Sequence, residues 1–172
     1  MKSQLTLNTI LLLFVLGFVT ACSSSGKLLV TQPRKQSIAP GKTVALLVEP
    51  DVAEPRPIHQ EVASRVRERL FGKLVAEGLF KSVVHSQEIA DYQMDVKIKG
   101  ARQVSTGARI FLGVMAGSNN LNLDVKIHDQ PQNQLITAFQ VTGKSASHPF
   151  SSEAALDDAI REAVDKITQA LR

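Results

Sequence analysis

The residue types that could support catalysis or metal binding are few in this chain of 172 residues, and they lie far apart in the sequence. The histidines lack the i, i+4 and His-Glu spacings of a helical zinc site, and a single cysteine excludes a cysteine-based zinc site or an internal disulfide. No Gly-x-Ser-x-Gly nucleophile motif is present. We therefore predict no catalytic residue, no metal site and no cofactor. The four histidines are His59, His85, His128 and His148.

Charged and glycine-rich segments offer no stronger sign of chemistry. Asp95 and Asp124 are expected on solvated strand faces, and Asp91 and Asp129 at strand ends, where aspartate commonly organises turns. The glycines between residues 107 and 117 lack the spacing of a phosphate-binding loop. The net charge of +4 is mild, and no aromatic residues interleave the basic ones. Nucleic-acid and nucleotide binding are not indicated.

The sharpest signal surrounds the only cysteine, Cys22. A positive start at Lys2 is followed by an apolar run over residues 10–19, which is shorter than the ~20 residues of a membrane-spanning helix. This pattern predicts a signal peptide over residues 1–21. The tetrapeptide Val19-Thr20-Ala21-Cys22 resembles the bacterial lipobox. That resemblance implies that the chain is cleaved between Ala21 and Cys22, that the Cys22 thiol carries acyl chains, and that Ser23 after it favours delivery to the outer membrane.

Residues 22–41 are rich in Ser, Lys, Gln and Pro, so we expect a lipidated cysteine followed by a flexible tether. The remaining residues, 42–172, are predicted to form one α/β domain. Apolar periodicity predicts strands near residues 43–49, 80–85, 92–99, 121–128 and 135–141, with the last three as an antiparallel meander. Amphipathic helices are predicted over about 57–77 and from residue 151 or 152 to 171.

This order, β-α-β-β-β-β-α, predicts an α+β two-layer sandwich. Its mixed sheet of about five strands carries both helices on one face, and the other face is polar.

Four features together resemble a group of proteobacterial envelope lipoproteins whose domain has no known function. They are the lipobox, the unit of the first helix and the strand after it, the Ala90-Asp91-Tyr92 opening of the third strand, and the fourth strand running into Asp129. The group is distantly similar in layout to the amino-terminal domain of TolB. The resemblance implies an α/β fold and an envelope location, and it supplies no catalytic residues.

One apolar segment, residues 108–117, lacks strand periodicity and contains glycines at both joints. It either extends the hairpin over the core edge or forms an exposed loop that docks on a partner, because exposed apolar patches mark interaction sites. Other candidate contact surfaces are a free sheet edge and the polar sheet face of Lys97, Lys99, Asn122 and Lys126. The residues of the loop predicted to bind a partner are Ile110, Phe111, Leu112, Val114 and Met115.

We therefore expect a non-enzymatic lipoprotein at the periplasmic face of the bacterial outer membrane. It would act as a binding or assembly module, held to the membrane by its lipid anchor and partnered by another envelope protein. Two alternatives are a lipid or glycolipid carrier and an envelope enzyme with a dispersed active site. A cavity lined by Leu70, Leu74, Phe139 and Ile160 would favour the carrier, and three polar residues converging in one pocket would favour the enzyme.

Overall fold

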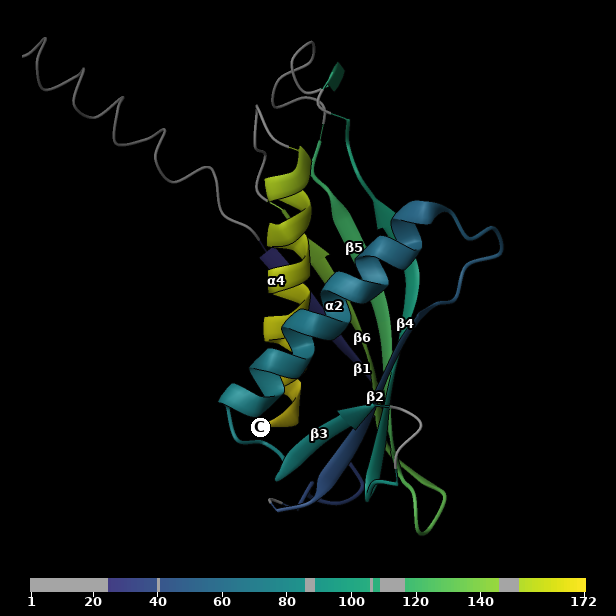
Figure 1. The fold of residues 1–172 in the computed structure, drawn as a ribbon, viewed down its shortest axis with the longest axis vertical. Coiled ribbons are helices and arrows are strands. Elements are labelled where there is room, and N and C mark those ends of the chain that lie inside the picture. Colours follow the sequence, from purple (N-terminus) through teal and green to yellow (C-terminus); the bar gives the residue numbers. More distant parts are fainter. Residues whose placement is uncertain (1–24, 40, 86–88, 106, 109–116, 146–151) are drawn as a thin grey trace, which may run out of the picture.

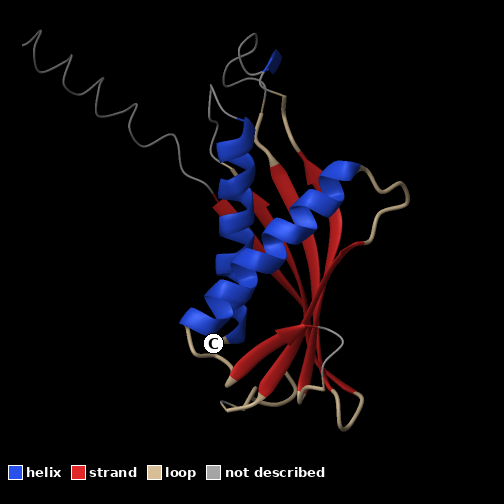
Figure 2. Cartoon of the chain, viewed as in Figure 1, coloured by secondary structure: helices blue, strands red, loops and turns tan. Residues whose placement is uncertain are grey.

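The computed structural model describes residues 25–39, 41–85, 89–105, 107–108, 117–145 and 152–172. They form a six-stranded mixed sheet with two long helices packed on one of its faces (Figures 1 and 2). The two-layer α+β sandwich predicted from the sequence is therefore confirmed. The strands in spatial order are β1 (Ser25–Gln32), β6 (Gln134–Lys144), β5 (Asn120–Asp129), β4 (Tyr92–Arg102), β2 (Thr43–Pro50) and β3 (Ser82–His85).

Strand pairing follows from the connections between elements. Strands β4, β5 and β6 pair antiparallel in sequence order, which confirms the predicted meander. Strand β2 lies parallel to β3, because helix α2 (Pro57–Ala76) connects the two as a crossover, and it also lies parallel to β4 on its other side. Alternate residues of β4 and β5 are buried, as expected for strands that face the helices on one side only.

The sheet has one strand more than the roughly five predicted, and that strand corrects the proposed domain boundary. Strand β1 pairs antiparallel with β6 from Ser25 opposite Lys144 to Val30 opposite Phe139. These residues lie within the segment 22–41 that we expected to be a tether, so the sheet begins at residue 25 rather than 42. Strand β1 shows no burial period because it is a largely exposed edge strand, held mainly by main-chain pairing.

Both helices bury the faces that their sequence periodicity predicted. Residues Val62, Val66, Leu70 and Leu74 of α2 are completely buried against the sheet. Val75 lies outside this buried stripe and is exposed. Helix α4 (Ser152–Leu171) buries its own apolar stripe beside α2. No helix in the described ranges combines the length and apolarity needed to cross a bilayer.

The start of α2 gives a structural role to the buried histidine His59. The main-chain N–H of Arg56 donates a hydrogen bond to His59 Nδ1 at 3.0 Å, and Pro57 occupies the first helical turn. Gly78 ends the helix region with a positive φ of 62°, the backbone conformation typical of a helix C-terminal glycine.

Gly143 of β6 sets the distance between the sheet and α4. A Cβ atom at this position would meet the carbonyl oxygen of Ala159 and lie 3.0 Å from the Ala163 Cβ. The Ala159 carbonyl belongs to the backbone of α4, so it cannot move away from an added Cβ as a flexible side chain could. The absence of a side chain at Gly143 therefore allows α4 to pack directly on the sheet.

Hydrogen bonds of Asp91 connect the start of β4 to the start of β2. The Thr43 main-chain N–H donates to Asp91 Oδ2 at 2.8 Å, and the Asp91 N–H donates to the Thr43 carbonyl at 3.0 Å. Lys42 Nζ lies 2.9 Å from Asp91 Oδ1. The Thr43 hydrogen bond, reinforced by Lys42, lowers the pKa of the Asp91 carboxyl.

The Gly143→Ala substitution is expected to lower the free energy of unfolding by about 1–3 kcal/mol or more, because it overpacks a contact with helix backbone. The matched control is Gly72→Ala in α2, where an added Cβ meets no atom within 4 Å. That control should raise stability by about 0.5–1 kcal/mol, because alanine favours the helix. Urea unfolding of both variants measures the difference. Equal effects would show that the sheet and α4 are not in close contact at Gly143.

The Asp91→Asn variant is expected to be less stable than the wild type at neutral pH. A carboxyl whose pKa is lowered in the folded state stabilises above its unfolded pKa of about 3.9, and this stabilisation is lost as the pH falls through the folded pKa. The stability difference between the two proteins should therefore shrink at acid pH. Denaturant midpoints at neutral and acid pH measure it. A difference independent of pH would mean that the charge of Asp91 contributes nothing.

Candidate functional site

The residues predicted to carry the lipid and to contact a partner through the apolar loop lie outside the described residues. The structure therefore leaves their roles as predictions. They are Ala21 and Cys22 in residues 1–24, and Ile110, Phe111, Leu112, Val114 and Met115 in residues 109–116.

Neither α2 nor α4, the two long helices of the described residues, covers the polar face of the sheet, as predicted, but the lysines of this face are matched by carboxylates. Lys97 forms an ion pair with Glu49 of the neighbouring strand β2. Lys99 Nζ lies 2.9 Å from Asp51 Oδ2, and this hydrogen bond lowers the pKa of Asp51 and raises that of Lys99. These contacts neutralise much of the cationic character expected of this face.

The remaining polar residues of this face also have neighbours of matching chemistry. Asn122 Oδ1 accepts a hydrogen bond from Thr142 Oγ1 at 2.9 Å. Lys126 lies opposite Asp95 in the β4–β5 register. Cross-strand pairs of this kind stabilise a sheet. The face predicted as a contact surface is thus a network of paired groups, which makes it a weak candidate for a binding site.

The carboxylates considered for acid/base chemistry have structural roles. Asp129 Oδ1 accepts the main-chain N–H of Gln132 at 3.0 Å and so closes the turn between β5 and β6. Asp95 accepts a hydrogen bond from Gln93 at 2.7 Å and lies 4.0 Å from His128 Nε2. Within the described ranges, no three His, Cys, Asp or Glu residues are grouped so as to hold a metal ion.

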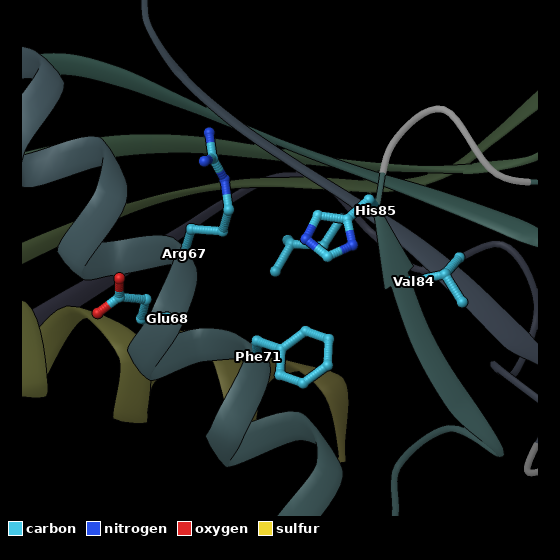
Figure 3. A pocket seen from close by; sticks show the side chains of 6 residues that line it. Arg67, Glu68, Phe71, Val84 and His85 are labelled. Carbon is cyan, nitrogen blue, oxygen red and sulfur yellow. The ribbon is translucent and has the colours of Figure 1, made fainter.

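A groove of about 310 Å³ lies between α2 and the sheet edge formed by β2 and β3. Leu46 of β2 contributes a buried apolar side chain, and Phe71 projects from α2 with 38% of its surface exposed. His85 pairs with Leu46 in the β2–β3 register and therefore lies on the helix side of the sheet. Figure 3 shows the rings of Phe71 and His85 bordering the space, while the Val84 side chain points to the other side of β3.

Two charged residues of α2 border the groove without converging in it. The Arg67 guanidinium donates to the main-chain carbonyl of Val48 at 2.8 Å, so it caps an acceptor on β2. The carboxylate of Glu68 points away from the space in Figure 3. The groove is consequently an apolar slot with a charged border, the composition typical of a site that holds an apolar group.

The groove lies where one edge of the sheet is only partly covered. Strand β3 pairs with β2 only over Thr43–Leu46, whereas β2 continues to Pro50. In the described part of the chain, residues 47–50 pair with β4 on one side, and the other side is met by Arg67. The apolar slot therefore opens beside the stretch of β2 that β3 does not pair with in the described residues.

A second cavity, of about 370 Å³, separates α2 from α4 but has different walls. It is crossed by the ion pair between Lys73 Nζ and Asp165 Oδ1, which lie 3.0 Å apart. Arg69 and Arg161 also line it. Charged side chains form much of its wall, so it offers a ligand less apolar contact than the groove.

Sequence reasoning did not identify the groove. The available signal was Phe71, a large apolar residue that lies outside the buried 62-66-70-74 stripe of α2. His85 was considered only as a metal ligand. Recognising the site required knowing that β3 lies at the sheet edge next to this part of α2, and this juxtaposition depends on topology.

Solved structures with this architecture come from several bacteria. PelC from Paraburkholderia phytofirmans, a dodecamer, matches with a TM-score of 0.57 at 16% identity, over 85% of this chain and 97% of that chain. A DUF4136 family protein from Bacteroides thetaiotaomicron matches with a TM-score of 0.52 at 13% identity, over 87% and 98%. A DUF330 protein from Xanthomonas campestris matches with a TM-score of 0.51 at 15% identity, over 83% and 87%. These identities establish a shared fold.

The sequence comparisons give a family and no described activity. No curated protein matches the chain. Residues 29–149 match a family described as a domain of unknown function, DUF4410. The matched segment begins inside β1 and extends beyond β6, so it includes the whole sheet except the first residues of β1. The chain therefore belongs to the DUF4410 family.

Proposed function

We propose that this protein is a non-catalytic binding or assembly module of the bacterial envelope. In this proposal, acyl chains on Cys22 hold it to the outer membrane, with the domain on the periplasmic side. The groove between α2 and β3 captures an extended segment of another envelope protein. The single observation that carries the binding role is the apolar slot beside the part of β2 that β3 does not pair with in the described residues.

The anchor is supported by the sequence around Cys22. An apolar run too short to span a bilayer, followed by Val19-Thr20-Ala21-Cys22 and Ser23, matches the order of a lipoprotein signal. We also propose that the chain belongs with proteobacterial envelope lipoproteins similar in layout to the amino-terminal domain of TolB. Two acyl chains on one sulfur-linked anchor would give stable membrane attachment, because each buried methylene contributes about 0.8 kcal/mol.

The binding role is supported by the chemistry of the groove. An extended segment added beside a sheet edge gains main-chain hydrogen bonds, while a side-chain pocket supplies selectivity. Leu46 and Phe71 provide an apolar surface for one side chain of that segment, and Glu68 and His85 border it. The loop residues Ile110–Met115 remain proposed as a second contact surface for the same partner.

The packing of the core supports a binding module over a lipid carrier. Leu70, Leu74, Phe139 and Ile160 would line a carrier cavity, but each is at most 2% exposed and belongs to one continuous core. Neither described cavity is lined by any of them. In the groove, the guanidinium of Arg67 is bonded to main chain and the Glu68 carboxylate points outward, so polar groups do not converge as an enzyme would require.

The Cys22→Ser variant is expected to lose lipid and to leave the membrane fraction, because serine provides no thiol for acylation. Metabolic labelling with palmitate, followed by membrane fractionation and mass spectrometry of the mature protein, measures this. The Ser23→Thr variant, which retains the thiol, serves as the matched control. Persistent palmitate labelling of Cys22→Ser would contradict the anchor.

The Phe71→Asp variant is expected to keep its thermal stability, because the Phe71 side chain is already 38% exposed. It should lose partner binding by more than tenfold, because a charged carboxylate replaces the apolar ring that borders the groove. A photo-crosslinking residue at position 71, used in cells, first identifies the partner. Binding of that partner to purified variants then measures the loss.

The control for this experiment is Val75→Asp, which changes an exposed apolar residue one turn along α2 and outside the groove. It should bind normally. Crosslinking from position 111 tests whether the apolar loop reaches the same partner. Equal binding by Phe71→Asp and the wild type would eliminate the groove as the binding site.

A further inference from the structure

We propose that strand β1 is a second membrane contact, which lies on an anionic bilayer surface and fixes the orientation of the domain. This inference rests on the proposed anchor at Cys22. It concerns a different surface from the groove, because β1 and β3 are the two opposite edges of the sheet. The bilayer contact would add to the acyl chains rather than replace them.

The first observation is an exposed apolar triplet on β1. Leu28, Leu29 and Val30 are 37%, 61% and 51% exposed, respectively. Leu28 and Val30 lie opposite buried Val141 and Phe139, whereas Leu29 lies opposite exposed Gln140, so the triplet covers both faces of the edge. Natural edge strands are commonly protected by charge, proline or a β-bulge, and β1 has Lys27 before the triplet and a bulge between Val30 and Gln32 after it. Between these two features three consecutive apolar side chains remain exposed, which indicates that another surface covers this edge.

The second observation is the short chain length between the proposed anchor and β1. Strand β1 begins at Ser25, three residues after Cys22. Three residues span at most about 10 Å, since an extended chain covers ~3.3–3.6 Å per residue. An acylated Cys22 would therefore hold the start of β1 at the bilayer surface. This proximity favours lipid over a partner protein as the surface that covers the triplet.

The third observation is a set of cations on the same edge. Lys27 lies beside the triplet, and Lys144 is opposite Ser25 at the start of the strand. The side chain of Lys166 on α4 packs next to Gly26. Lys35 follows the end of β1, whereas the guanidinium of neighbouring Arg34 donates to the Ala170 carbonyl of α4 at 2.7 Å. Apolar residues flanked by lysines match the chemistry of an interface with anionic headgroups.

The opposite edge of the sheet, at β3, differs in charge from β1, so the partner groove and the membrane contact are chemically distinct surfaces. Around Phe71, charges of both signs occur together, because Arg67 and Glu68 of α2 both border the groove. With β1 on the membrane, the groove at β3 lies five strand spacings away, or about 24 Å at ~4.8 Å per strand. The membrane contact thus presents the groove to the periplasm.

Tryptophan fluorescence can test this contact in the mature, acylated full chain, because the protein contains no tryptophan. A Leu29→Trp variant is reconstituted in vesicles of phosphatidylglycerol and phosphatidylethanolamine. We expect a blue-shifted emission that brominated acyl chains quench and aqueous acrylamide quenches poorly. The matched control is Val75→Trp, similarly exposed but on helix α2 rather than on β1, which acrylamide should quench freely.

Each other outcome overturns the proposal. Equal acrylamide quenching at positions 29 and 75 would show that β1 faces water. Protection of position 29 from acrylamide without quenching by brominated lipid would show that protein covers the edge. Thermal unfolding of both variants confirms that they fold before the fluorescence is compared.

A second arm separates this inference from the anchor. The Cys22→Ser chain, which carries no acyl group, is mixed with the same anionic vesicles and with purely zwitterionic ones. We expect weak binding to the anionic vesicles only, which salt reduces and Leu29→Glu lowers about tenfold. If the wild type carries no acyl group but the chain still binds anionic vesicles, only the proposed anchor at Cys22 is contradicted. If the wild type is acylated but the Cys22→Ser chain does not bind anionic vesicles, only the proposed membrane contact of β1 is contradicted.

Discussion

The burial of two helices against one face of an open sheet is the constraint on which the rest of this structure depends. Leu70 of α2, Ile160 of α4 and Phe139 of β6 meet in one continuous core, and Gly143 lets α4 approach the sheet backbone. Close packing of this kind leaves little interior volume for a ligand. Surfaces available for recognition are therefore displaced to the periphery of the sheet.

An open sheet has two edges, and in this protein the edges differ in chemistry. Strand β1 presents consecutive apolar residues among lysines, whereas β3 is short and leaves part of β2 beside an apolar slot. Edges that expose main chain invite unwanted association unless they are protected or used. Arg67, which donates to the Val48 carbonyl, is one such protection on β2. The two edges can consequently serve different partners without competing.

The sequence predicted those parts of the fold that depend on local periodicity. Alternation in β4 and β5 and the four-residue stripe of α2 each report burial on one face, so the meander and the helices were predictable. Strand β1 was missed because an edge strand is held by pairing with distant β6, which leaves no burial period. The groove was missed for a related reason, since Phe71 and His85 meet only through the position of β3.

The fold itself says little about what the protein binds, because chains only 13–16% identical share it. Binding specificity must therefore come from side chains that the fold holds at its surface and that its core packing does not need. Replacing Phe71 or Leu29 by another residue would preserve the core, since neither belongs to it. Asp91 and Gly143, in contrast, act in the architecture itself. Apolar residues that remain exposed at both edges, with no role in folding, are therefore the positions at which selection for binding would act.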